Sequence, residues 1–155
     1  MFNDHRSQIY STTMPHPTYC QRISSKRSKE IYTLIYKTIK KGKYYKDPKF
    51  STQQLSALLN INTRYIAAVV QLNTNRNFND LLNSFRMSEA EQMLLTAIEF
   101  SAEEIGLMSG FGSRQSFYRT FRKIHGITPR QFRMKQKKRV LTFSNTLPNK
   151  LHHKE

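Results

Sequence analysis

Residues 113–123, SRQSFYRTFRK, place side chains that can hydrogen-bond to a polar ligand opposite a set of apolar rings. At about 100° per residue of an α-helix, Phe117, Phe121 and Ile124 fall on one side. The other side carries Arg114, Gln115, Tyr118, Arg119 and Arg122. Arg and Gln make paired hydrogen bonds to guanine and adenine edges in the major groove of DNA, which is wide enough to admit a helix. The pattern therefore predicts a helix whose polar side binds DNA and whose apolar side packs on the protein.

The polar residues of this helix are expected to make more than one kind of contact. Gln115 and Arg119 lie one turn apart and are the strongest candidates for contacts to base edges. Contacts to bases or phosphates are expected for Arg114 and Tyr118, and contacts to phosphates or solvent for Arg122 and Lys123. A basic face that is merely solvated is the alternative interpretation.

The charge of the chain indicates the class of partner. Its 155 residues include 26 Lys and Arg against 10 Asp and Glu, which gives a formal net charge of +16 and a pI of about 10.2. Residues 1–50 contribute +8, residues 51–100 contribute −1 and residues 101–155 contribute +9. This balance favours a polyanionic partner, and both nucleic acid and a membrane surface qualify. The length fits one domain, or two very small ones, so we expect no separate sensor domain and no small-molecule effector site.

Several other classes of function are disfavoured by what the sequence lacks. The single cysteine, Cys20, excludes a disulfide within the chain and a cysteine-based zinc cluster. His152 and His153 have no third ligand nearby, so we expect no metal site. No apolar run approaches the roughly 20 residues that span a bilayer, and the N-terminal residues lack the apolar core of a signal peptide. We therefore expect a cytoplasmic protein without catalytic residues or cofactors, and no membrane partner.

Periodicity and composition divide the chain into three parts. Residues 1–27 are polar and basic, and we predict a flexible tail there. From Ser28, apolar residues at helical spacing predict an amphipathic helix with Ile31, Leu34, Ile35 and Ile39 on one side. Residues 135–155 are predicted to be a basic C-terminal tail, which is either an arm along the phosphates or a soluble end.

Capping residues predict where the other helices begin and end. Serine or threonine followed three residues later by Glu or Gln satisfies two backbone N–H groups at a helix start. This pattern occurs at Ser51, Ser101 and Thr128. Asn62 and Ser113 are predicted N-caps of two more helices, and Asn75 and Gly126 are their predicted left-handed C-terminal residues.

These marks form an internal repeat. Ser51, Gln54, Leu55 and Leu58 recur 50 residues later as Ser101, Glu104, Ile105 and Met108, and Asn62, Ile66, Val70, Asn75 and Leu81 recur 51 residues later as Ser113, Phe117, Phe121, Gly126 and Phe132. The repeat predicts two helix-turn-helix units, at about 51–76 and 101–126. Between them, residues 79–97 predict a linker helix of roughly 28 Å, close to the roughly 34 Å of one DNA turn. Its apolar residues are predicted to lie near one face: Leu82, Phe85, Ala90, Met93, Leu94 and Ala97.

The segment IGLMSGFGSRQSFYRTFRKIHGITPRQFR resembles the second helix-turn-helix of the AraC/XylS family of bacterial transcription regulators. The residues that carry the resemblance are Ile105, Gly110, Phe111, Ser113, Phe117, Phe121, Arg122, Gly126, Thr128, Pro129, Phe132 and Arg133. Residues 51–97 resemble the first unit and its linker helix, and the resemblance covers about residues 28–134. It implies an all-α domain of about seven helices, in which two helix-turn-helix subdomains are joined by a long linker helix. It also implies that the domain binds two successive major-groove segments on one face of duplex DNA.

The resemblance places a second set of candidate DNA-binding residues on the first recognition helix. These are Asn62, Thr63, Arg64, Ala67, Ala68 and Gln71, and they correspond to Ser113 and the polar residues that follow it in the second unit. The family usually carries a polar or basic residue where this chain has Ala67 and Ala68, so we expect Arg64 to be the main contact of the first helix. Arg86 is expected to be structural, paired with Glu89 or with a helix end.

The sequence thus predicts a sequence-specific regulator of transcription that binds double-stranded DNA at a promoter or operator, with RNA polymerase as a candidate partner. One alternative is the DNA-binding output part of a larger sensor protein. Another, of a different class, is a basic module that binds nucleic acid or membrane surfaces without sequence choice.

Overall fold

The computed structural model describes residues 24–146, with side chains placed for residues 24–138. Its helices are α1 (Ser25–Gly42), the short 3-10 helix η2 (Tyr44–Lys46), α2 (Thr52–Leu59), α3 (Thr63–Thr74), α4 (Phe78–Thr96), α5 (Ala102–Met108), α6 (Arg114–His125) and α7 (Pro129–Thr146). These residues contain seven α-helices and no strand, so the predicted all-α fold is confirmed. Cys20, His152 and His153 lie outside the described residues.

Both ends of the described part are more helical than the sequence predicted. α1 begins at Ser25, three residues before the expected start, because the hydroxyl of Ser24 accepts a hydrogen bond from the backbone N–H of Arg27 at 3.3 Å. At the other end, α7 continues through residue 134 to Thr146. The first part of the predicted C-terminal tail is therefore a helical extension of α7.

The predicted caps are present. Capping boxes with both reciprocal hydrogen bonds begin α2 at Ser51 and α5 at Ser101. Thr128 and Gln131 exchange equivalent bonds at the start of α7. The residues that end α3 and α6 have positive φ angles, 54° at Asn75 and 71° at Gly126, as their residue types favour. These local interactions define the two helix-turn-helix units, α2–α3 and α5–α6.

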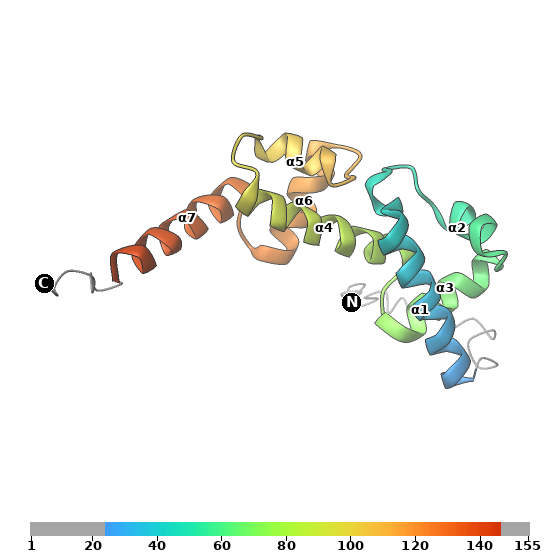
Figure 1. Cartoon of the computed structure of the whole chain (residues 1–155). Coiled ribbons are helices and arrows are strands. Elements are labelled where there is room, and N and C mark those ends of the chain that lie inside the picture. The colour runs from blue at the N-terminus through green and yellow to red at the C-terminus, as the bar shows by residue number, and fades with distance from the viewer. Residues whose placement is uncertain (1–23, 147–155) are drawn as a thin grey trace, which may run out of the picture.

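Two hydrophobic cores lie at the two ends of α4 (Figure 1). The first packs α1 through Ile31, Ile35 and Ile39 against α2, α3, η2 and the first half of α4. The second packs the last half of α4 against α5 and α6, with Phe117 and Phe121 fully buried. Two residues predicted to be on apolar faces are instead exposed, Leu34 by 46% and Ile124 by 55%. Each lies at the edge of its helix's apolar stripe, beyond the reach of the neighbouring helix.

The predicted apolar face of the linker helix α4 is divided between the two cores. Leu82 and Phe85 belong to the first core, whereas Ala90 and Leu94 belong to the second. At 3.6 residues per turn, the two pairs project roughly 130° apart around the helix axis. Helix α4 therefore contributes residues to both cores, on two different sides of the helix.

Arg86 lies between these two stretches and is 9% exposed. Its guanidinium donates hydrogen bonds to the backbone oxygens of Tyr45 at 2.7 Å and Asp47 at 2.9 Å, and to the Oδ1 atom of Asn83 at 3.3 Å. Burial lowers the pKa of Arg86 from its usual value, and the charge of Asp47 acts in the opposite direction. Arg86 thus binds the end of η2, which was one of its two predicted roles.

Glu89, the other predicted partner of Arg86, holds η2 from the next turn of α4. Its carboxylate lies 2.6 Å from the Nζ atom of Lys46 and accepts a hydrogen bond from the hydroxyl of Tyr45 at 3.0 Å. The bond to Lys46, and then that to Tyr45, lowers the pKa of Glu89 despite its partial burial. Arg86 and Glu89 together attach η2 firmly to the middle of α4.

The turn between α5 and α6 also touches η2, at Gly110. This glycine has a φ of 99°, and a Cβ atom there would collide with the backbone oxygen of Tyr45. The same Cβ would lie 2.7 Å from the Cα atom of Lys46. Because only glycine permits this approach and this φ, Gly110 brings the second helix-turn-helix against a corner of the first subdomain. The relative placement of the two units therefore depends on η2 as well as on α4.

Candidate nucleic-acid interface

The second recognition helix, α6, is held at its back by aromatic packing. Phe117 lies 5.2 Å from Phe111 and 5.6 Å from Phe121 between ring centroids. Helix α5 approaches this cluster at Gly106, where a Cβ atom would lie 2.5 Å from the Phe117 ring. The close approach places α6 rigidly on α5, as the apolar side of the sequence pattern predicted.

The front of α6 carries the predicted polar residues on the outside of the protein. Arg114, Gln115, Arg119, Arg122 and Lys123 are exposed, and Tyr118 is half-buried. A shallow hollow of about 530 Å³ is lined by Gln115, Tyr118, Arg119, Arg122 and Lys123. The structure thus brings these side chains together on one accessible surface, where hydrogen-bond donors and acceptors lie side by side.

Arg114 differs from its neighbours because it is partly engaged within the protein. Its guanidinium lies 3.2 Å from the carboxylate of Glu103 on α5, and it stands over the ring of Tyr118 at 5.2 Å from the centroid. Glu103 was absent from the sequence-based site. The two residues are separated by the turn between α5 and α6, so no helical spacing indicates their contact. Arg114 and Tyr118 form a unit with Glu103 at the start of the recognition helix.

The first recognition helix, α3, presents fewer hydrogen-bonding groups. Arg64, Ala67 and Gln71 are exposed and Thr63 is half-buried. Ala68 was predicted to face outward but is only 5% exposed. Ala68 therefore offers almost no surface to a ligand.

Two further candidate residues, Asn62 and Ser113, act as helix caps. The Oδ1 atom of Asn62 accepts a hydrogen bond from the N–H of Arg64 at 2.8 Å, and the hydroxyl of Ser113 accepts one from the N–H of Ser116 at 3.2 Å. Both residues lie exposed at the N-terminal ends of the recognition helices. Backbone N–H groups at such ends favour anions.

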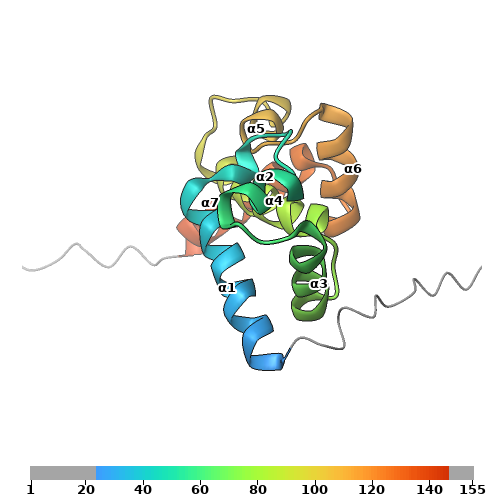
Figure 2. The ribbon, with the colours of Figure 1, turned by 90° about the vertical axis from the view of Figure 1, so that its right-hand side faces the viewer.

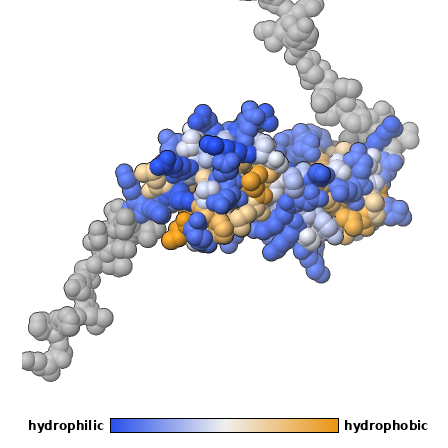
Figure 3. All heavy atoms as spheres, turned by 90° about the horizontal axis from the view of Figure 1, so that it is seen from above, coloured by the Kyte–Doolittle hydropathy of each residue, from blue (hydrophilic) through white to orange (hydrophobic). Residues whose placement is uncertain are grey.

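Helices α3 and α6 lie on the same side of the molecule when it is viewed along its long axis, with α1 on the other side (Figure 2). They are separated along α4 and belong to different cores (Figure 1). The face seen from above is mostly hydrophilic, with small separate hydrophobic areas (Figure 3). The two exposed recognition helices are thus arranged to meet one extended ligand on one side.

The described part of the chain offers neither a metal cluster nor a membrane-spanning helix. Residues 24–138 contain no group of three or more His, Cys, Asp or Glu side chains placed to hold a metal ion. Within the described helices, none is both long enough and apolar enough to cross a membrane.

The fold and this surface define a domain with two helix-turn-helix units on a shared linker helix. Residues 55–135, just over half of the chain, match the family described as "Helix-turn-helix domain". The chain belongs to this family, and its relatives are of the AraC type.

Two curated relatives and one solved structure show the extent of the similarity. The chain is 41% identical over 58 residues to the HTH-type transcriptional activator CfaD and to the DNA-binding dual transcriptional regulator Rns, both of Escherichia coli. Each match covers 37% of this chain and 22% of the relative, so the chain spans about a fifth of their length. The C-terminal domain of the two-component response regulator yesN from Fusobacterium nucleatum is 32% identical, with a TM-score of 0.59. That match covers 67% of this chain and 98% of the domain.

Proposed function

We propose that this protein is a sequence-specific transcription regulator that binds two adjacent major-groove segments of double-stranded DNA. The observation that carries the proposal is the exposure of α3 and α6 on one side of the molecule, each in its own helix-turn-helix unit. Helix α6 supports it further, because its exposed side is made of the residue types that bind base edges.

In this function the two helices have unequal tasks. Gln115 and Arg119 bind base edges in one groove, while Arg64 is the principal polar contact of α3 in the other. Arg122 and Lys123 lie one turn further along α6 and suit phosphate contacts, which position the protein without selecting a sequence. The basic residues of α7 and of both ends of the chain add affinity through release of counterions from the duplex.

Two further features of the proposal concern control. The protein acts in the cytoplasm, without a cofactor, and its abundance sets promoter occupancy. RNA polymerase is its proposed partner at the promoter. An alternative is that the chain is the output part of a larger sensor protein. That reading is favoured by the 22% coverage of the curated relatives and by the likeness to the C-terminal domain of a response regulator.

Selection from a random duplex library tests the proposal. We expect enrichment of a motif with two blocks whose centres are about 10 bp apart, one helical turn of DNA. Competition with unrelated duplex, repeated over a range of salt concentrations, separates specific from non-specific binding. Equal binding to all sequences at every salt concentration would instead support the basic module without sequence choice.

A further inference from the structure

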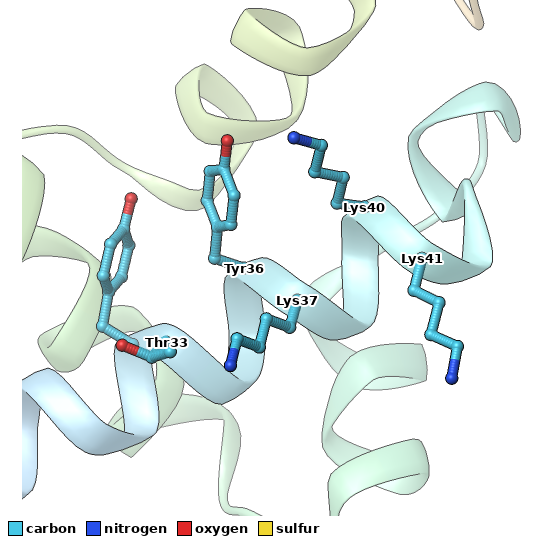
Figure 4. A pocket seen from close by; sticks show the side chains of 6 residues that line it. Thr33, Tyr36, Lys37, Lys40 and Lys41 are labelled. Atoms are coloured by element: carbon cyan, nitrogen blue, oxygen red, sulfur yellow. The ribbon is translucent and has the colours of Figure 1, made fainter.

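A groove of about 670 Å³ runs along α1, outside the face that packs into the first core (Figure 4). It is lined by Tyr32, Thr33, Tyr36, Lys37, Lys40 and Lys41. The core-facing residues of α1 are Ile31, Ile35 and Ile39. Tyr32 packs against the edge of the same core, and the lysines of the groove project away from it. In Figure 2, α1 lies beside α3, against which it packs, and away from α6.

The groove combines aromatic edges with uncompensated positive charge. The Tyr36 ring lies 4.8 Å from Phe85 and 6.3 Å from Tyr32 between centroids, and the Nζ atom of Lys40 stands 5.9 Å from its centroid. In the described part of the chain, no carboxylate lies within ion-pair distance of Lys37, Lys40 or Lys41. Tyrosine hydroxyls and lysine ammonium groups, which Figure 4 shows projecting from the helix, are donors for carboxylate oxygens.

We propose that this groove is a docking site for an acidic segment of another protein. Carboxylates of the segment bind the three lysines and the tyrosine hydroxyls, and an apolar side chain packs on the ring edges of Tyr32 and Tyr36. From residue 32 to residue 41 the groove is about 14 Å long, which fits two to three turns of a helix. This partner is additional to the DNA of the proposed function.

Other occupants fit the chemistry less well. A second copy of the chain carries 26 basic residues against 10 acidic ones, and residues 1–23 contain a single acidic residue, Asp4. Single-stranded nucleic acid binds aromatic residues by stacking bases on free ring faces. The ring of Tyr36 is already approached by Phe85 and Lys40, so it is poorly available for stacking.

Fluorescence anisotropy with a defined probe tests the proposal. The probe is a labelled peptide of about twelve residues, the length of roughly three helical turns, in which Asp and Glu flank one Phe and one Leu. The double variant Lys37→Gln, Lys40→Gln removes two charges from the groove. The matched control Lys135→Gln, Lys137→Gln removes two exposed charges from α7. Thermal unfolding of each variant confirms that it is folded.

We expect the groove variant to bind the peptide about three- to tenfold more weakly, in line with the loss of two exposed ion pairs, and the control to bind as the parent does. Duplex DNA binding, measured on the same samples, should be weaker in the control, because its two lysines belong to α7, and the ranking of DNA sequences should be unchanged in both variants. Equal peptide binding by both variants overturns the proposal, as does tighter binding of a single-stranded RNA probe at the groove. If no sample selects a DNA sequence, the proposed regulator function is contradicted. The peptide measurement still decides the docking proposal, because it does not depend on DNA binding.

Discussion

Glu103 of α5 forms an ion pair with Arg114, the first residue of the second recognition helix, at 3.2 Å. Both side chains are substantially exposed, so the carboxylate competes with any phosphate or base that approaches Arg114. Glu103→Gln should therefore tighten binding to duplex DNA by about two- to fivefold. The slope of log K against log salt should steepen by about 1, because one more cation is free to displace a counterion. Glu99→Gln, which removes another exposed carboxylate, should change the slope less, and equal slopes in the two variants would contradict this account.

The two recognition helices should contribute unequally to sequence choice. A bidentate contact to a base gives about 1–3 kcal/mol of discrimination. Gln115→Ala or Arg119→Ala should thus weaken specific binding by about 10- to 100-fold and relax preference in one block. Among the outward residues of α3, only Arg64→Ala should have a comparable cost. Lys123→Ala is the control and should weaken binding evenly across sequences. The test measures binding of these variants to the selected site and to DNA sites that differ from it by one base. If the block bound by α3 proves the more selective, DNA shape rather than direct base contact determines specificity there.

Gly110 should control the distance between the recognition helices. Both Gly110 and Gly126 have positive φ angles, but no atom lies within 4 Å of a Cβ atom built at Gly126. Gly126→Ala should therefore cost only the conformational penalty, about 1–2 kcal/mol of unfolding free energy. Gly110→Ala should cost more, because its methyl group also collides with Tyr45 and Lys46. Urea unfolding measures both variants.

The same two variants test the role of η2 in DNA binding. The test uses duplexes in which the two blocks are moved apart or together by single base pairs. Gly126→Ala should show the same preference among these spacings as the parent protein. Gly110→Ala should lose part of this spacing preference, because its second unit no longer sits against η2. An unchanged spacing preference in Gly110→Ala would mean that α4 alone sets the distance.

Glu89 should make the stability of the first subdomain sensitive to acid. Hydrogen bonds from Lys46 and Tyr45 lower its pKa below the ordinary value of 4.5, so folding favours the charged carboxylate. The stabilisation is present above that ordinary value and is lost as the pH falls through the lowered pKa of the folded state. Urea midpoints measured from neutral pH to below about pH 4.5 should fall more steeply in the parent than in Glu89→Gln. The urea midpoint of Glu99→Gln should fall as steeply with decreasing pH as that of the parent. If the midpoints of Glu89→Gln and Glu99→Gln fall equally steeply, the effect belongs to other carboxylates.

The sequence by itself determined the helices and the chemistry of the second recognition helix. Caps such as Ser101 with Glu104 act over three residues, and Gly126 needs only its own φ angle, so these features depend on neighbours along the chain. The division of α6 into an apolar back and a polar front follows from helical geometry alone. The helix-turn-helix repeat was visible for the same reason.

Only the tertiary structure decided how these parts meet. Leu82 and Leu94 pack into different cores because one core forms at each end of α4, and the pattern of a single helix cannot reveal which neighbour each residue meets. Glu103 with Arg114, Arg86 with Tyr45, and Gly110 against η2 are contacts between separate elements. The burial of Ala68 likewise appears only in the folded protein. Such contacts follow from the crossing and spacing of packed helices, which local propensity does not encode.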